Sequence, residues 1–121
     1  NLKDFFSESA EEKLVFGPQD YPVKEDDSGS VTWLVPSAQK NNMEPILVSI
    51  NPGASLEEDD PHEGEEFGYV LSGKIVLHLG NSQKKCRKGD SFYFKPTMPH
   101  YIENTGKMPA LLLWVSTPPS F

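Results

Sequence analysis

The most constraining feature of this chain is a series of short apolar segments separated by glycine, proline and asparagine. Seven segments have the length and residue types of β-strands, and they cover residues 30–35, 45–50, 65–71, 74–79, 91–94, 100–104 and 110–116. Short strands at this spacing are typical of a β-sandwich or barrel. A chain of 121 residues is long enough for one domain with a real core. We therefore predict an all-β, single-domain protein.

Turn residues predict how the strands connect. Glycine and asparagine accept the positive φ of tight turns, so Ser72-Gly73 and residues 80–82 are expected to form hairpins between antiparallel strands. Residues 19–29 are polar and contain proline, which predicts a loop. Residues 2–14 are the one helix-like segment, and they are short and acidic. We divide the chain into an arm or linker, residues 1–29, and a barrel, residues 30–121.

Charge and cysteine content exclude several functional classes. The chain has 11 Lys and Arg residues against 18 Asp and Glu residues, a formal charge of -7. DNA-binding surfaces need clustered cations, so this segment is not expected to bind DNA by itself. A single cysteine excludes an internal disulfide, and no apolar run approaches the roughly 20 residues of a membrane helix. We expect a cytoplasmic protein without membrane contact. The thiol pKa of Cys86 would be lowered by its basic neighbours Lys84, Lys85, Arg87 and Lys88.

Histidines and carboxylates at two places in the sequence predict one polar site. Side chains alternate between faces along an extended strand, so Asp60, His62 and Glu66 share one face. They can converge with His100 only if the two strands pair. Two imidazoles and one carboxylate suit a divalent Zn, Mn, Fe or Ni ion, and Asp60 would add a fourth ligand. The same groups can instead hydrogen-bond one another and water inside a small barrel.

The positions next to this site predict space for a small ligand. Gly68 and Val70 share the face of Glu66 and carry little bulk. The residues that we assign to ligand binding are Glu66, Gly68, Val70, His100 and Ile102. The acidic run at residues 56–66 is either a solvated loop or a cluster that attracts a cation, such as an amine or polyamine effector.

The order and spacing of these residues resemble the two motifs of the cupin superfamily. Asp60 stands where the first motif usually has its first histidine. The positions that fit are His62, Glu66 and Gly73 in the first motif and Gly89, His100 and Asn104 in the second. The resemblance implies a double-stranded β-helix, a jelly-roll barrel whose interior holds a metal.

A narrower resemblance covers nearly the whole chain. The segments EEFGYVLSG, GDSFYFKP, MPH and WVSTPPSF are similar to the C-terminal sensor domain of bacterial regulators that join an XRE-type helix-turn-helix to a cupin. The resemblance implies an effector-binding domain without enzymatic activity, and DNA binding through an N-terminal domain absent from this sequence. A metal-dependent cupin enzyme of the dioxygenase or isomerase type is the alternative, because two histidines and a carboxylate also suit such catalysts.

A homodimer is expected as well. A single barrel exposes strand edges and an apolar outer sheet face, and packing against a second copy covers them. The final segment LLLWVSTPPSF is the candidate contact, or else residues 111–115 form a central core strand.

Overall fold

The computed structural model describes residues 13–121, so nearly all of the segment expected to be helical lies outside the described residues. Two short 3-10 turns, η1 (Pro18–Asp20) and η2 (Ala38–Lys40), accompany nine strands in this part of the chain. The strands are β1 (Val23–Asp26), β2 (Gly29–Trp33), β3 (Glu44–Ile50), β4 (Glu65–Ser72), β5 (Lys74–Leu79), β6 (Ser82–Arg87), β7 (Ser91–Phe94), β8 (His100–Glu103) and β9 (Ala110–Thr117).

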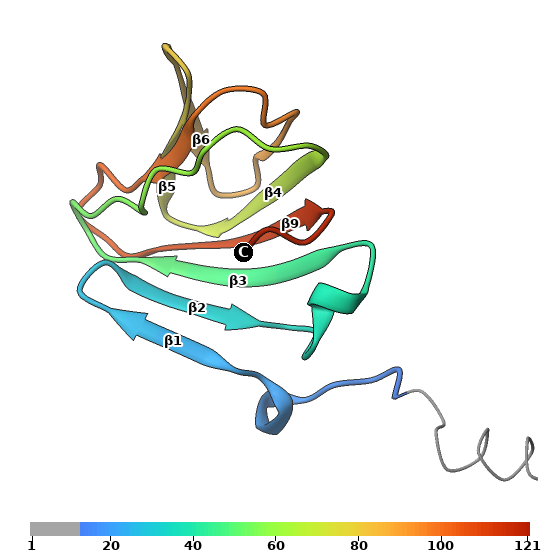
Figure 1. The fold of residues 1–121 in the computed structure, drawn as a ribbon. Helices are drawn as coiled ribbons and strands as arrows, with labels where there is room; N and C mark the ends of the chain where they lie inside the picture. Colours follow the sequence, from blue (N-terminus) through green and yellow to red (C-terminus); the bar gives the residue numbers. More distant parts are fainter. Residues whose placement is uncertain (1–12) are drawn as a thin grey trace, which may run out of the picture.

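The strands form two antiparallel sheets. The larger sheet has the order β1-β2-β3-β9-β4-β7, and the smaller has the order β6-β5-β8. Figure 1 shows β1, β2, β3, β9 and β4 in succession from the bottom of the view, with β5 and β6 toward the top. The order is not sequential, because β9 lies between β3 and β4. The predicted all-β jelly-roll fold is confirmed.

The core lies between the sheets and follows the two-residue period of a strand. In β3 the side chains of Ile46, Val48 and Ile50 are buried, while those between them are partly exposed. The register places Val48 opposite Leu112 and Ile46 opposite Trp114 of β9, so the inner faces of both strands form one apolar layer. The smaller sheet contributes Ile75, Leu77 and Ile102 to the same core.

Two strands have no counterpart among the predicted ones. β1 lies within the segment expected to be a loop, and all of its side chains are exposed. β6 reads SQKKCR, and only Cys86 among its side chains is buried. Both strands form because their backbones pair with a neighbouring strand, which a search for apolar periodicity does not detect.

One of the two predicted hairpins is wrong. The turn at Gly80 and Asn81 does join the paired strands β5 and β6. The Ser72-Gly73 turn instead carries the chain from one sheet to the other, since β4 pairs with β7 and β9 while β5 pairs with β6 and β8. Gly73 has φ +76°, and a Cβ there would lie 2.7 Å from the carbonyl oxygen of Pro109. This sheet-crossing corner therefore requires glycine.

A buried carboxylate fixes the last residues against the barrel. Glu44, with 0% of its surface exposed, accepts hydrogen bonds from the backbone N–H groups of Ser120 and Phe121 on Oε1. Its Oε2 accepts from Trp33 Nε1 and Gln39 Nε2. These contacts hold the Phe121 ring 5.0 Å from the ring of Trp114, at one end of the barrel interior.

The outer face of the larger sheet is apolar. Leu111, Leu113 and Val115 of β9 point outward and are partly buried, whereas the alternate residues Leu112 and Trp114 are core. β9 is thus a central strand with an apolar side chain on each face, which confirms the expectation of a central core strand for residues 111–115. Within the described residues, no helix is long or apolar enough to span a membrane.

Candidate functional site

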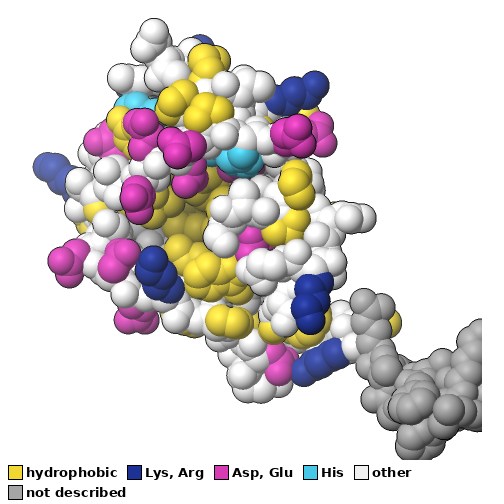
Figure 2. All heavy atoms as spheres, viewed as in Figure 1, with side chains coloured by type: hydrophobic (Ala, Val, Ile, Leu, Met, Phe, Trp, Pro, Cys, Tyr) yellow, Lys and Arg dark blue, Asp and Glu magenta, His cyan; other side chains and the backbone are white. Residues whose placement is uncertain are grey.

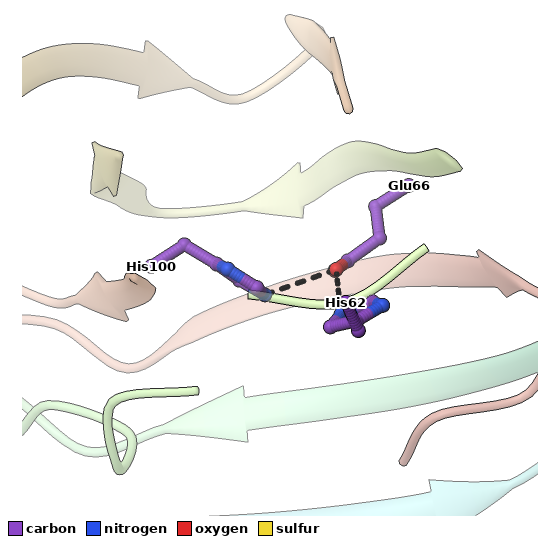
Figure 3. Close-up of side chains that lie close together, drawn as sticks. All are labelled: His62, Glu66 and His100. Carbon is purple, nitrogen blue, oxygen red and sulfur yellow. Dashed lines mark ion pairs between the residues drawn. The ribbon is translucent and has the colours of Figure 1, made fainter. Parts of the chain in front are cut away.

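Three of the predicted site residues meet inside the barrel. Glu66 Oε2 lies 2.9 Å from His62 Nε2 and 3.0 Å from His100 Nε2. Glu66 belongs to β4, His100 begins β8, and His62 lies in the segment that precedes β4 (Figure 3). The expected pairing of the two strands is wrong, because β4 and β8 lie in different sheets and their side chains meet across the barrel interior. Glu66 and His100 are 1% and 0% exposed, so the centre of the cluster is shielded from solvent.

The local structure explains how each side chain reaches this centre. Glu66 shares the inward face of β4 with the buried Gly68 and Val70. The backbone N–H of His62 donates to the carbonyl oxygen of Pro96 at 2.9 Å, which ties the segment before β4 to the chain leading into β8. The cluster therefore depends on contacts between segments that are far apart in sequence.

The hydrogen bonds of the two imidazole rings determine which ring nitrogen carries the proton. His62 Nδ1 is 3.0 Å from the carbonyl oxygen of Glu63, and His100 Nδ1 is 3.0 Å from that of Met98. A carbonyl oxygen accepts only, so Nδ1 carries the proton in both rings, and Nε2 of a neutral ring presents a lone pair. Both Nε2 atoms face a carboxylate oxygen, which also has only lone pairs. A proton or a metal ion between them satisfies this arrangement.

The polar atoms at the centre of the cluster are buried: both carboxylate oxygens of Glu66 and Nε2 of His100. Within residues 13–121, neither carboxylate oxygen of Glu66 nor Nε2 of His100 has a hydrogen bond of good geometry. Burial by itself lowers the pKa of His100, but the Glu66 carboxylate and the Met98 carbonyl raise it overall. Unsatisfied buried acceptors are costly, so the site favours a bound cation.

The donor set fits a divalent transition ion. The ligand atoms of His62, Glu66 and His100 all lie within 4.8 Å of one another. Imidazole nitrogen and carboxylate oxygen are ligands that Zn, Mn, Fe and Ni accept. The residues would hold such an ion at the N-terminal end of β4.

Asp60, the predicted fourth ligand, does not join this cluster. Its side chain is exposed, whereas the Oδ2 atom of the neighbouring Asp59 lies 3.7 Å from His100 Nε2. The expected alternation requires residues 60–66 to form one continuous strand. β4 begins only at Glu65, and Gly64 has φ +108°, which interrupts the alternation. Burial raises the pKa of the Asp59 carboxyl group.

The space expected next to Gly68 is filled. A Cβ on Gly68 would lie 2.1 Å from the ring of Phe92, so this ring occupies the room that the missing side chain leaves. Val70 and Ile102 are both 0% exposed and belong to the packed core. Of the residues assigned to ligand binding, only Glu66 and His100 lie in the polar cluster.

A cavity of about 320 Å³ opens elsewhere in the barrel, between the inner face of β2, β3 and β9 and the acidic segment. Figure 2 shows a hollow with hydrophobic side chains in its floor and acidic side chains along one side. The cavity lining includes Trp33, Trp114 and Phe121, with Glu57 and Asp59 on the acidic side. Asp59 therefore connects the cavity with the His–Glu–His cluster. The sequence pattern did not predict that Trp33 and Phe121 line a cavity. Both are positioned by hydrogen bonds to Glu44, which is distant from Phe121 in the sequence.

Cys86 differs from the expectation drawn from its basic neighbours. The side chain is buried on the inner face of β6, while the adjacent basic residues point outward. Burial, together with the charge of Asp90, raises its thiol pKa instead of lowering it.

The fold and the site define a class of protein: a jelly-roll barrel with an inward-facing pair of histidines and a carboxylate. The sequence matches the Cupin_2 family, described as Cupin domain, over residues 46–116. The chain belongs to the cupin domain family.

Similar proteins include both a regulator and an iron-containing structure. The chain is 30% identical to the HTH-type transcriptional regulator PuuR of Escherichia coli K12 over 124 aligned residues, covering 100% of this chain and 67% of PuuR. The crystal structure of the Cupin_2 domain of an XRE family transcriptional regulator from Enterobacter cloacae has a TM-score of 0.65 and 21% identity, covering 84% of this chain and 100% of that one. Fe(II) HppE has a TM-score of 0.73 and 20% identity, covering 88% and 61%. This chain is thus related to a cupin domain of transcriptional regulators.

Proposed function

We propose that this chain is the effector-sensing domain of a transcriptional regulator, in which a small molecule binds in the barrel beside a metal held by His62, Glu66 and His100. The observation that carries this proposal is the alignment with PuuR, which extends over the whole chain and leaves a third of PuuR unmatched. DNA binding would then reside in a domain outside this sequence, which agrees with a net charge of -7. Such a regulator acts in the cytoplasm, where the free thiol of Cys86 stays reduced.

The cavity suggests the chemistry of the effector. Its aromatic lining from Trp33, Trp114 and Phe121 suits an alkyl chain or an ammonium group, which is attracted to ring faces. The charged residues of the lining are three carboxylates and one cation, so negative charge predominates there: Asp26, Glu57, Asp59 and Lys24. An amine or polyamine satisfies both features. A bound divalent ion would supply a Lewis acid that accepts a donor atom of the effector, while the three ligands hold its position.

Signal transfer requires two states with different affinity for the effector. An effector moves an equilibrium only through that difference in affinity. The apolar outer face of β4 and β9 offers an element for such a change, since we propose that it packs against a second copy. Tyr69, Leu113 and Leu47 lie in register across β4, β9 and β3, and Tyr69 is 38% exposed. A contiguous apolar stripe of this kind supports the proposed contact with a second copy.

Metal content and effector binding test the proposal together. Protein purified without chelator is analysed by mass spectrometry, comparing the natural chain with His62→Ala, His100→Ala and His78→Ala. His78 is the control histidine, because it is hydrogen-bonded to Glu103 on the outer face of the smaller sheet and lies outside the metal cluster. We expect a near-stoichiometric transition metal in the natural chain and His78→Ala, and its loss in the other two. Calorimetry with putrescine and spermidine then tests the effector, and the absence of heat with both contradicts an amine sensor.

A metal-dependent enzyme is the second candidate, favoured by the two histidines and one carboxylate. Oxygen consumption by the Fe(II)-loaded protein, lost in His100→Ala, would support it. Within the described residues, the metal cluster consists of His62, Glu66 and His100, and Asp59 adds a carboxyl group 3.7 Å from His100 Nε2. Asp59 is therefore the candidate acid or base of this alternative, whereas the other three side chains would serve as metal ligands.

A further inference from the structure

A second concave surface lies on the outside of the smaller sheet, away from the barrel interior. A groove of about 840 Å³ runs between the outer face of β5 and β6 and the loop that follows β8. Its sides carry the basic side chains of Lys74, Lys85, Arg87, Lys88 and Lys107. Val76 and Met108 give it an apolar part. The groove has the size of a small-molecule site.

The charge of this groove is opposite to that of the chain. Acidic residues outnumber basic ones by 18 to 11, yet five of the basic residues and no acidic residue line the groove within the described part of the chain. None of these five forms an ion pair with another residue in the 13–121 range. Two nearby carboxylates are engaged elsewhere: Glu103 contacts His78, and Asp90 accepts the backbone N–H of Arg87.

The strand register adds an independent observation. Lys74 and Arg87 are direct cross-strand partners in the β5–β6 pair, and Lys85 is opposite Val76 on the same face. Like charges directly opposite each other destabilise a sheet. Lysines on the edge strand β6 are explained by protection of an open edge. That explanation does not apply to Lys74 on the central strand β5 or to Lys107 on a loop.

The loop side of the groove is held in place. Asn104 is 0% exposed, and its Nδ2 donates to the carbonyl oxygens of Met108 at 2.8 Å and Ile50 at 2.9 Å. Its Oδ1 accepts the backbone N–H of Gly106 at 2.9 Å. Lys107 and Met108 are therefore carried on a loop tied to the core, and the groove is formed before any ligand binds.

From these observations we propose that the groove binds a small organic polyanion, a phosphorylated or polycarboxylate molecule. Its charged groups lie between Lys74, Lys85 and Arg87, where they relieve the repulsion between the cross-strand cations. Its apolar part lies against Val76 and Met108. This site is separate from the metal cluster and would give the protein a second ligand.

Calorimetry and amide NMR at low salt test the proposal, with inorganic pyrophosphate and citrate as probes on the full chain. Binding of either probe supports it, and the preferred probe tells phosphoryl from carboxylate chemistry. We expect Lys85→Ala/Arg87→Ala to weaken binding by about 10-fold or more, since two charge-assisted contacts are lost. Lys95→Ala is the control, because Lys95 is exposed and does not line the groove. Thermal melting shows whether the variants remain folded.

Three results would overturn the proposal. One is no binding of either probe up to about 10 mM, a concentration at which even weak specific sites are occupied. Another is an equal loss in Lys95→Ala, which indicates attraction to surface charge in general. The third is binding of duplex DNA through the same residues without binding of pyrophosphate or citrate, which makes the groove a nucleic-acid surface. Failure of the metal or polyamine experiments leaves this proposal unaffected.

Discussion

Asp59 and His100 exchange two backbone hydrogen bonds. The N–H of Asp59 donates to the carbonyl oxygen of His100 at 2.8 Å, and the N–H of His100 donates to that of Asp59 at 3.1 Å. This isolated β-bridge holds the Asp59 carboxylate beside the imidazole of His100, with 3.7 Å between Oδ2 and Nε2. Backbone pairing thus places Asp59, and not Asp60, next to the cluster.

Removing this carboxylate should weaken metal binding. We expect Asp59→Ala to raise the Kd for Zn²⁺ or Mn²⁺ about 10-fold, or about 1.4 kcal/mol, because it removes a negative charge 3.7 Å from the ring nitrogen that faces the ion. Asp60→Ala is a matched control, since Asp60 is the next residue, carries the same charge and is exposed. Competition with a chelating dye measures both. Equal effects of the two substitutions would show that Asp59 acts only through net charge.

Filling the space over Gly68 should destabilise the barrel. The added Cβ of Gly68→Ala would overlap the Phe92 ring, and overpacking of a core costs about 1–3 kcal/mol. Urea unfolding measures the change. The double variant Gly68→Ala/Phe92→Leu should lose less stability than the sum of its single changes. Strict additivity would contradict direct contact between the two positions.

Neutralising Glu44 should loosen the C-terminal tail. In Glu44→Gln an amide NH₂ replaces one of two oxygens that each accept two N–H groups, so donors remain buried without a partner. We expect a loss of about 2–4 kcal/mol in the free energy of unfolding. Trp33→Phe removes one donor and keeps the carboxylate, so it should cost less. If amide exchange at Ser120 and Phe121 is faster in Glu44→Gln but not in Trp33→Phe, the effect lies in the C-terminal tail.

Charging the outer sheet face should separate the proposed dimer. Leu113→Lys places an ammonium in the centre of the apolar stripe, where desolvation of the charge opposes association. Analytical ultracentrifugation should report a dimer for the natural chain and a monomer for the variant. Lys95→Ala again serves as the control. A natural chain that is monomeric at about 100 µM, well above the Kd of a stable dimer, contradicts the proposed interface.

The Cys86 thiol should react slowly in the folded protein. It is 5% exposed, and burial raises its pKa, so little accessible thiolate exists near neutral pH. Alkylation by iodoacetamide at pH 8 should be at least about 10-fold slower than in urea-unfolded protein, because thiolate fraction and access both fall. Equal rates in the two states would place the thiol at the surface.

The sequence by itself determined the elements whose side chains alternate. In β3, β4 and β9 the buried residues recur at every second position, and they include the carboxylates Glu44 and Glu66 as well as apolar and small side chains. The face that Glu66 shares with Gly68 and Val70 therefore follows from a period of two. The place of His62 and His100 in the cluster follows instead from the resemblance of their spacing to the cupin motifs, because Gly64 interrupts the alternation between His62 and β4.

Tertiary structure alone decided the features that depend on backbone pairing and on packing between distant segments. β1 and β6 exist because a neighbouring strand satisfies their hydrogen bonds, and Asp59 adjoins His100 because two segments form a bridge. Phe92 fills the space over Gly68 only because β7 pairs with β4. Alternation specifies the face that a side chain occupies, whereas the neighbour it meets there depends on register and strand order, which local sequence does not encode.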